Sequence, residues 1–167
     1  MEEYMMRKRN CILAAIFFLC IFPVSASMVS FLVVETGISE DLPLNQISTI
    51  WESGLMAAFF DAGHIVTDSP VTRIEKKPQV DLSGTIASDF SEAAGYGAEY
   101  FVLGFIEYEN QGGRAVPVGI SLKLYKIDSK KLIVERNFPV GTAKSPAEEH
   151  KLAQDAGAAI ISHLQGN

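Results

Sequence analysis

Cysteine is scarce in this chain. Of its 167 residues only two are cysteines, Cys11 and Cys20, and both lie near the amino terminus. A domain that began after these positions would form no disulfide, bind no zinc through cysteine and use no cysteine nucleophile. Such a domain must be stabilised by its hydrophobic core alone, and about 140 residues are enough for that.

Sequence patterns that carry catalytic chemistry are also missing. The chain has no Gly-x-Ser-x-Gly motif, which presents a serine nucleophile on a sharp turn in many hydrolases. Its glycines at 95–97 and 112–113 are not followed by the lysine and serine or threonine of a phosphate-binding loop. The histidines, His64, His150 and His163, lack the spacing that places two metal ligands on one helix face. We therefore predict no catalytic, cofactor or metal site, and a protein that is not an enzyme.

Basic residues are outnumbered by acidic ones. The chain has 14 lysines and arginines against 20 aspartates and glutamates, which gives a net charge of −6. Proteins that bind nucleic acid or an anionic membrane surface carry a basic excess instead. We therefore expect no nucleic-acid partner.

The first 26 residues have the pattern of a secretory signal peptide. Basic residues 7–9 precede the apolar run 11–24, and Val24 and Ala26 would occupy the −3 and −1 positions of a cleavage site. The run contains Pro23 and is shorter than the roughly 20 apolar residues that span a membrane. We predict export to the periplasm or beyond, cleavage after Ala26, and no membrane span in the mature protein.

Two alternatives to cleavage after Ala26 stay open. In one, the apolar run is retained as an N-terminal anchor. In the other, Cys20 carries a lipid, although the bulky residues 17–19 precede it where a lipid-attachment cysteine follows small residues. With cleavage, the mature chain 27–167 has the size of one domain and a net charge of −7.

Residues 27–167 are predicted to form one α/β domain. Alternating strands and helices, followed by strands joined through short turns, indicate a mixed sheet flanked by helices. The predicted order is strand, helix, strand, helix, three strands, helix. The predicted strands are 30–35, 64–68, 100–106, 118–125 and 132–140, and the helices are 47–62, 85–96 and 145–164.

Three segments carry more specific expectations. Residues 100–106 are apolar on both faces, which predicts a strand in the middle of the sheet. Residues 118–125 alternate apolar residues with small or polar ones, which predicts a strand with one exposed face. Residues 71–84 are predicted to be a polar connection without regular structure.

Five side chains form a candidate partner-contact surface. Two of them, Met56 and Phe60, fall beside the main apolar stripe of helix 47–62. The other three, Arg73, Lys76 and Lys77, form a small basic patch in an acidic chain. Core packing of the helix flank and a solvated loop for the basic residues are the competing interpretations.

Three further residues suggest a different function. Glu107 and Glu109 lie two residues apart on one predicted strand, and paired carboxylates catalyse glycoside hydrolysis. With His64 as a proton-transfer group, they would make the chain a hydrolase or a small-molecule binding module. This alternative requires the three side chains to converge in one pocket. The competing interpretation is a solvated strand end for the glutamates and a helix-end position for His64.

Three stretches, 60–66, 93–104 and 124–132, resemble sequence motifs of a bacterial envelope superfamily. The first resembles its helix, small turn and strand, the second its alanine-rich helix running into a glycine-bearing strand, and the third its hairpin. Members include the periplasmic domain of the curli-secretion channel protein, lipoprotein activators of penicillin-binding proteins and the amino-terminal domain of TolB. The resemblance implies a mixed sheet flanked by helices and a non-catalytic role in envelope assembly, with envelope proteins as partners. An oligomeric structural component is a further alternative.

Overall fold

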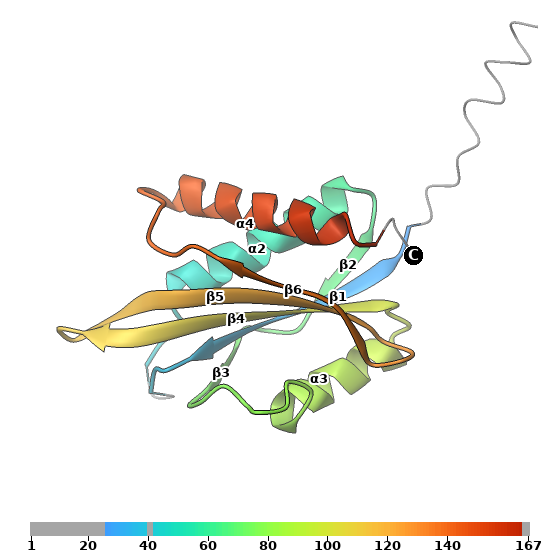
Figure 1. The fold of residues 1–167 in the computed structure, drawn as a ribbon, viewed down its shortest axis with the longest axis horizontal. Coiled ribbons are helices and arrows are strands. Elements are labelled where there is room, and N and C mark those ends of the chain that lie inside the picture. The colour runs from blue at the N-terminus through green and yellow to red at the C-terminus, as the bar shows by residue number, and fades with distance from the viewer. Residues whose placement is uncertain (1–25, 40–41, 165–167) are drawn as a thin grey trace, which may run out of the picture.

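The structure, a computed structural model, describes residues 26–39 and 42–164. The predicted signal peptide, with Cys11 and Cys20, lies outside the described residues except for Ala26. Figure 1 shows the described chain as a sheet with α2 and α4 on one face and α3 on the other. The elements in order are β1 (Met28–Thr36), α2 (Gln46–Asp61), β2 (Ile65–Asp68), β3 (Thr72–Ile74), α3 (Gly84–Gly95), β4 (Tyr100–Gln111), β5 (Arg114–Lys126), β6 (Lys131–Phe138) and α4 (Pro146–Ile161).

The sheet is mixed, and the predicted α/β fold is confirmed. Its strand order is β2-β1-β4-β5-β6, with β3 beside β1 after β2. The strands β2, β3 and β4 run parallel to β1, while β5 and β6 continue as an antiparallel meander. As predicted, the apolar strand β4 lies in the middle, where helices cover both of its faces.

The ends of the helices follow the local sequence. The Asn45 side chain accepts a hydrogen bond from the Ile47 amide and caps α2. At the other end of α2, Gly63 has a φ of 87°, and the amides of Gly63 and His64 bond the carbonyls of Phe60 and Phe59. A Schellman motif of this kind stops a helix and sends the chain onward. It sets the direction in which the chain enters the edge strand β2.

Residues 145–148 at the start of α4, Ser-Pro-Ala-Glu, have the sequence of a capping box, which forms only in part. The Ser145 hydroxyl accepts a hydrogen bond from the Glu148 amide at 3.2 Å, and Pro146 is the first residue of the helix. The Glu148 carboxylate, however, accepts from the Lys144 amide and not from that of Ser145. The reciprocal bond of a capping box therefore shifts by one residue.

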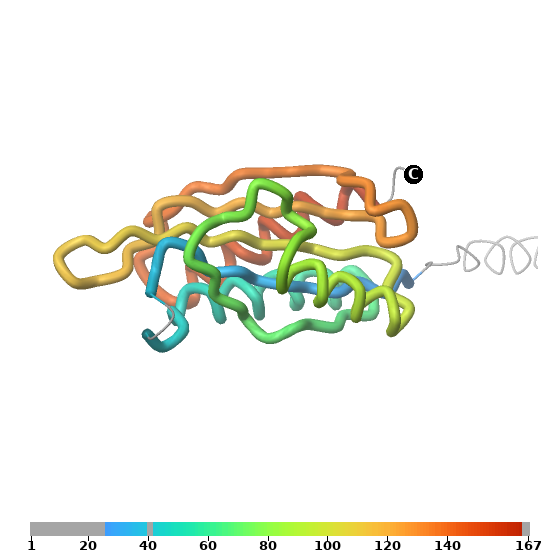
Figure 2. The backbone as a smooth tube through the Cα atoms, turned by 90° about the horizontal axis from the view of Figure 1, so that it is seen from below, coloured from blue at the N-terminus to red at the C-terminus, as the bar shows by residue number. Residues whose placement is uncertain are grey.

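Two expectations for the sheet are wrong. The connection 71–84 contains the short strand β3, which pairs with the end of β1. Strand β5 is buried on both faces from Ile120 to Tyr125, because the connection before α3 covers the face predicted to be exposed. Figure 2, which views the molecule from the α3 side, shows this connection and α3 in front of the strands. The β4–β5 hairpin extends past the rest of the molecule in the same view.

None of the helices formed by the described residues combines the length and apolarity needed to cross a membrane.

Candidate functional site

Glu107, Glu109 and His64 do not converge, so the single pocket that the hydrolase or binding-module alternative requires of them does not form. His64 immediately precedes Ile65, which pairs with Met28 at the start of β1. Glu107 pairs with Thr36 at the end of β1, and Glu109 lies further along the same hairpin. The nine residues of β1 from Met28 to Thr36 place the two ends about 26 Å apart. His64 instead packs its ring against Phe59, with the ring centroids 5.8 Å apart.

The candidate partner-contact surface divides into two separate places. Met56 and Phe60 lie near the end of α2, on the side of the molecule where β1 begins. Lys77 lies at the opposite end of the sheet, where its ammonium group contacts Glu107 at 2.8 Å, and Lys76 is exposed beside it. The five residues therefore do not form one surface.

Arg73 does not belong to any exposed patch. Its side chain is 6% exposed and forms an ion pair with Glu35, which is fully buried. The guanidinium also donates to the carbonyls of Ser39, Leu42 and Pro43. Arg73 therefore joins β3, the end of β1 and the loop before α2. The interpretation of this arginine as a partner contact is corrected to a structural role.

A second polar cluster holds the connection before α3 over the sheet. Asp81 accepts hydrogen bonds from Lys123 at 2.7 Å and from the hydroxyl of Tyr125. Burial alone would raise the pKa of Asp81, but these hydrogen bonds and the lysine charge outweigh burial and lower it. The carboxylate is thus kept ionised, and the cluster explains why the polar face of β5 is covered.

The flank of α2 that faces the edge strand β2 combines apolar and acidic side chains. Glu52, Met56 and Phe60 follow one another at four-residue steps, so they share one side of the helix. Met56 is partly buried against the core, whereas Phe60 is 67% exposed. Glu52 has a buried carboxylate oxygen, Oε1, with no hydrogen-bond partner among the described residues. We call Glu52, Met56 and Phe60 the α2 flank.

The Glu52 carboxyl is in an unfavourable environment. Burial raises its pKa above the ordinary value, and the negative charge of Asp68 on β2 raises it further. A carboxylate that is partly desolvated, close to a second acid and without a donor would be stabilised by a cation. The α2 flank therefore has the chemistry to receive a lysine or arginine beside an apolar group.

Replacing Glu52 with glutamine is expected to stabilise the domain at neutral pH. A raised carboxyl pKa means that the folded state binds the proton more tightly than the unfolded state, so ionised Glu52 reduces stability above its folded pKa. This penalty disappears as the pH falls through the folded-state pKa towards about 4.3, the pKa of glutamate in the unfolded chain. We expect the Tm of Glu52→Gln to rise by about 1–2 °C at pH 7 and the rise to shrink towards pH 4. The exposed Glu109→Gln is the control, and a lower Tm for Glu52→Gln at pH 7 would contradict the expectation.

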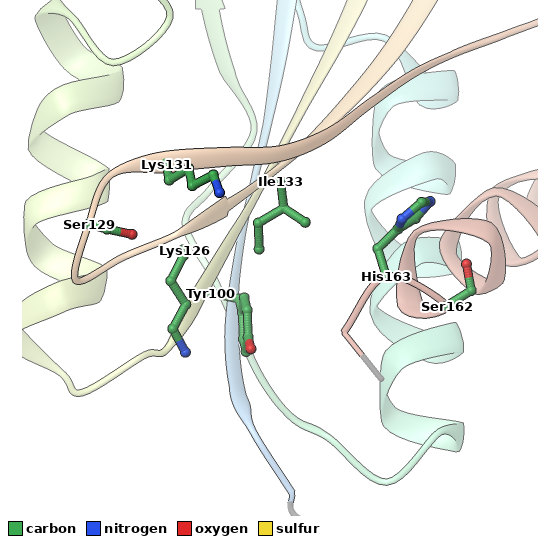
Figure 3. Close-up of a pocket in the computed structure, with 7 residues that line it drawn as sticks. All are labelled: Tyr100, Lys126, Ser129, Lys131, Ile133, Ser162 and His163. Atoms are coloured by element: carbon green, nitrogen blue, oxygen red, sulfur yellow. The ribbon is translucent and has the colours of Figure 1, made fainter. Parts of the chain in front are cut away.

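An open pocket of about 610 Å³ lies where α4 ends over the sheet, at the same end as His64. Figure 3 shows the strand side chains on one side of it and the side chain of His163 on the other. The residues lining it are Tyr100, Lys126, Ser129, Lys131, Ile133, Ser162 and His163. We call this the basic pocket.

The basic pocket was not predicted from the sequence. Its lining comes from three strands, the turn between β5 and β6, and the end of α4, and these segments meet only through the strand register and the packing of α4. The one local signal was that Lys126 and Lys131 flank the turn between two predicted antiparallel strands. No group of three histidine, cysteine, aspartate or glutamate side chains within the described ranges is close enough to hold a metal ion.

Comparison with known proteins finds similar folds among solved structures. The PelC dodecamer from Paraburkholderia phytofirmans is 16% identical, with a TM-score of 0.48 and coverage of 85% of this chain and 89% of that chain. TolB from Acinetobacter baumannii is 17% identical, with a TM-score of 0.43, and the match covers 86% of this chain and 29% of TolB. The LpoB C-terminal domain from Salmonella enterica is 17% identical, with a TM-score of 0.36 and coverage of 72% and 87%. No protein-family model and no curated protein matches the sequence.

The likeness is one of fold. TolB is also among the proteins that the sequence motifs resemble. The likeness assigns no residue of this chain to a ligand or a partner.

Proposed function

We propose that this chain is a non-catalytic interaction domain that acts in cell-envelope assembly, with the α2 flank as its protein-binding surface. The signal-peptide pattern of residues 1–26 and the motif resemblance support an envelope location. Glu107 and Glu109 lie far from His64, so these three residues do not form the hydrolase site that the sequence suggested.

Phe60 is the observation that carries this proposal. Three other phenylalanines, Phe59, Phe101 and Phe105, are fully buried, while Phe60 exposes two thirds of its surface. Aromatic side chains, phenylalanine included, are enriched in protein–protein interfaces relative to the rest of the surface. The neighbouring Glu52 carboxylate lacks a donor, so a partner with an apolar group beside a lysine or arginine would satisfy both residues.

Substituting Phe60 is expected to abolish binding without unfolding the domain. The experiment uses the tagged full-length chain in the producing bacterium, with a photo-crosslinking amino acid at the exposed position Asp61. We expect a crosslinked protein that decreases by about tenfold or more in Phe60→Ser, the loss typical of an aromatic interface residue. The free energy of unfolding should change by less than about 0.5 kcal/mol, because the side chain is at the surface.

Tyr96→Ser is the matched control, because Tyr96 is 69% exposed and directly follows α3, the helix on the opposite face of the sheet. It should leave the crosslink unchanged. A crosslink that survives Phe60→Ser, or no crosslinked protein at all, would overturn the assignment of this surface. A crosslinked product of twice the chain mass would identify a second copy as the partner. Fractionation of the same cells tests export, for which we expect a mature chain that begins at Ser27.

A further inference from the structure

The basic pocket lies on the same face of the sheet as α4 but just beyond the end of this helix. Tyr100 pairs with Lys126 across β4 and β5, and Lys126 pairs with Lys131 across β5 and β6. Paired residues of neighbouring strands project to the same face, so these three side chains form a row across the sheet. Helix α4 ends at Ile161, and His163 follows at the side of the pocket opposite the strands. The pocket is therefore built by the register of three strands and the length of one helix.

The lining of the basic pocket has charges of one sign. It contains two lysines and a histidine, while none of its seven residues is acidic, in a chain whose net charge is −6. The Lys126 ammonium lies 4.2 Å from the centroid of the Tyr100 ring, which holds this cation against the floor of the pocket. Lys126 is also 3.8 Å from Glu99, a half-exposed carboxylate outside the lining. No carboxylate among the described residues lies within 4.0 Å of the Lys131 ammonium.

Several carbonyl groups at the end of α4 already accept hydrogen bonds from within the chain. The carbonyls of Ile160 and Ile161 accept hydrogen bonds from the amides of His163 and Leu164. The Ser162 hydroxyl donates to the carbonyl of Ala159. A hydrogen-bonded carbonyl oxygen repels a nearby anion less than a free one does, so the end of α4 is compatible with an anion in the pocket.

We propose that the basic pocket binds a small organic anion. Its carboxylate or phosphate group would be held by Lys126, Lys131 and His163, and its apolar part would lie against Ile133 and Tyr100. The pocket volume is within the range of about 300–1,000 Å³ that is typical of ligand sites. Lysine ammonium groups act as compact point charges without the fixed fork of arginine, so this lining accepts either kind of anion. This site uses other residues than the α2 flank, and it does not depend on the function proposed for that flank.

The test is a titration of the full chain, as recovered after export, followed by amide chemical shifts in NMR and by calorimetry. The probes are benzoate, phenyl phosphate, inorganic phosphate and the neutral benzyl alcohol. We expect benzoate or phenyl phosphate to bind about tenfold or more tightly than benzyl alcohol, as two charge-assisted contacts would produce. The shifts should be confined to the pocket residues. Comparison of the two aromatic anions shows whether carboxylate or phosphate is preferred, and inorganic phosphate shows what the apolar part adds.

A double substitution, Lys126→Gln with Lys131→Gln, should reduce anion affinity by about tenfold or more and leave binding of benzyl alcohol unchanged. Lys144→Gln is the matched control, because Lys144 is an exposed lysine at the other end of α4. It should change affinity by less than about twofold, since a distant exposed charge is screened by salt. Anion shifts spread over many surface lysines, or equal affinity in the double variant, would overturn the proposal. Equal binding of benzoate and benzyl alcohol would overturn it as well, because the pocket would then select apolar groups and not anions.

Discussion

Replacing Arg73 with alanine is expected to lower the free energy of unfolding by about 3–5 kcal/mol. The substitution leaves the Glu35 carboxylate buried without its cation and removes the donor from three loop carbonyls. One oxygen of Glu35 still accepts from the Asn45 amide at 2.7 Å, which compensates only part of the loss. A whole domain is stable by only about 5–15 kcal/mol, so the loss should be plain in urea unfolding at pH 7.

Lys77→Ala supplies the control for the Arg73 prediction. Lys77 and Glu107 form an ion pair at the same end of the sheet, but their side chains are 34% and 45% exposed. Breaking an exposed pair costs at most about 1 kcal/mol. A double variant, Arg73→Met with Glu35→Gln, should recover part of the stability, because no unpaired charge then remains buried. Equal losses for Arg73→Ala and Lys77→Ala would show that Arg73 is not buried as described.

The elements with strong hydrophobic patterns were predicted correctly from the sequence. The run 100–106 is apolar at every position except Gly104, and such a strand is stable only when both faces are covered. The predicted helices 47–62 and 85–96 end just before Gly63 and Gly97 for a related reason. Both residues have positive φ angles, which glycine adopts without steric cost. Local sequence determines these features, so it was enough to predict them.

The segments that were predicted wrongly depend on contacts between residues that are distant in the sequence. Strand β3 has three residues, one of them the charged Arg73, and only its pairing with β1 makes it a strand. A buried arginine is unusual, and its cause, Glu35, is 38 residues away. A signal was present in Glu35 itself, a carboxylate directly after the apolar run 31–34, because a buried acid needs a partner.

The candidate sites were predicted to different degrees for the same reason. The α2 flank was partly found, since Met56 and Phe60 fall beside the apolar stripe of a single helix. The basic pocket was missed because Tyr100, Lys126 and His163 come from two strands and the end of a helix. Helical periodicity reports which residues share a side of one element. It does not report which elements meet.

The contact between α2 and α4 depends on two glycines, and it leads to the second large expected effect. A Cβ atom on Gly54 would lie 2.6 Å from the Cβ of Ala153 and 2.8 Å from the carbonyl oxygen of His150. On the facing helix, a Cβ atom on Gly157 would lie 2.7 Å from the Cβ of Ala58. Distances this short force the helices apart or distort them. Gly54→Ala is therefore expected to destabilise the domain by about 1–3 kcal/mol through overpacking.

Gly95→Ala is the matched control, because it introduces the same methyl group at a helical position where no atom beyond the adjoining helix backbone lies within 4 Å. Alanine is favoured over glycine in helices by about 1 kcal/mol, so this variant should be slightly more stable than the parent. The two glycine-to-alanine substitutions should therefore change the free energy of unfolding in opposite directions, as measured by urea unfolding. This difference separates the effect of the helix contact from that of helix propensity. Adding Ala153→Gly to Gly54→Ala should restore only part of the stability, since the contact with the His150 carbonyl remains. If Gly54→Ala instead stabilises the domain as Gly95→Ala does, α2 and α4 do not pack at this distance, and the placement of the α2 flank and of the basic pocket beside them would need revision.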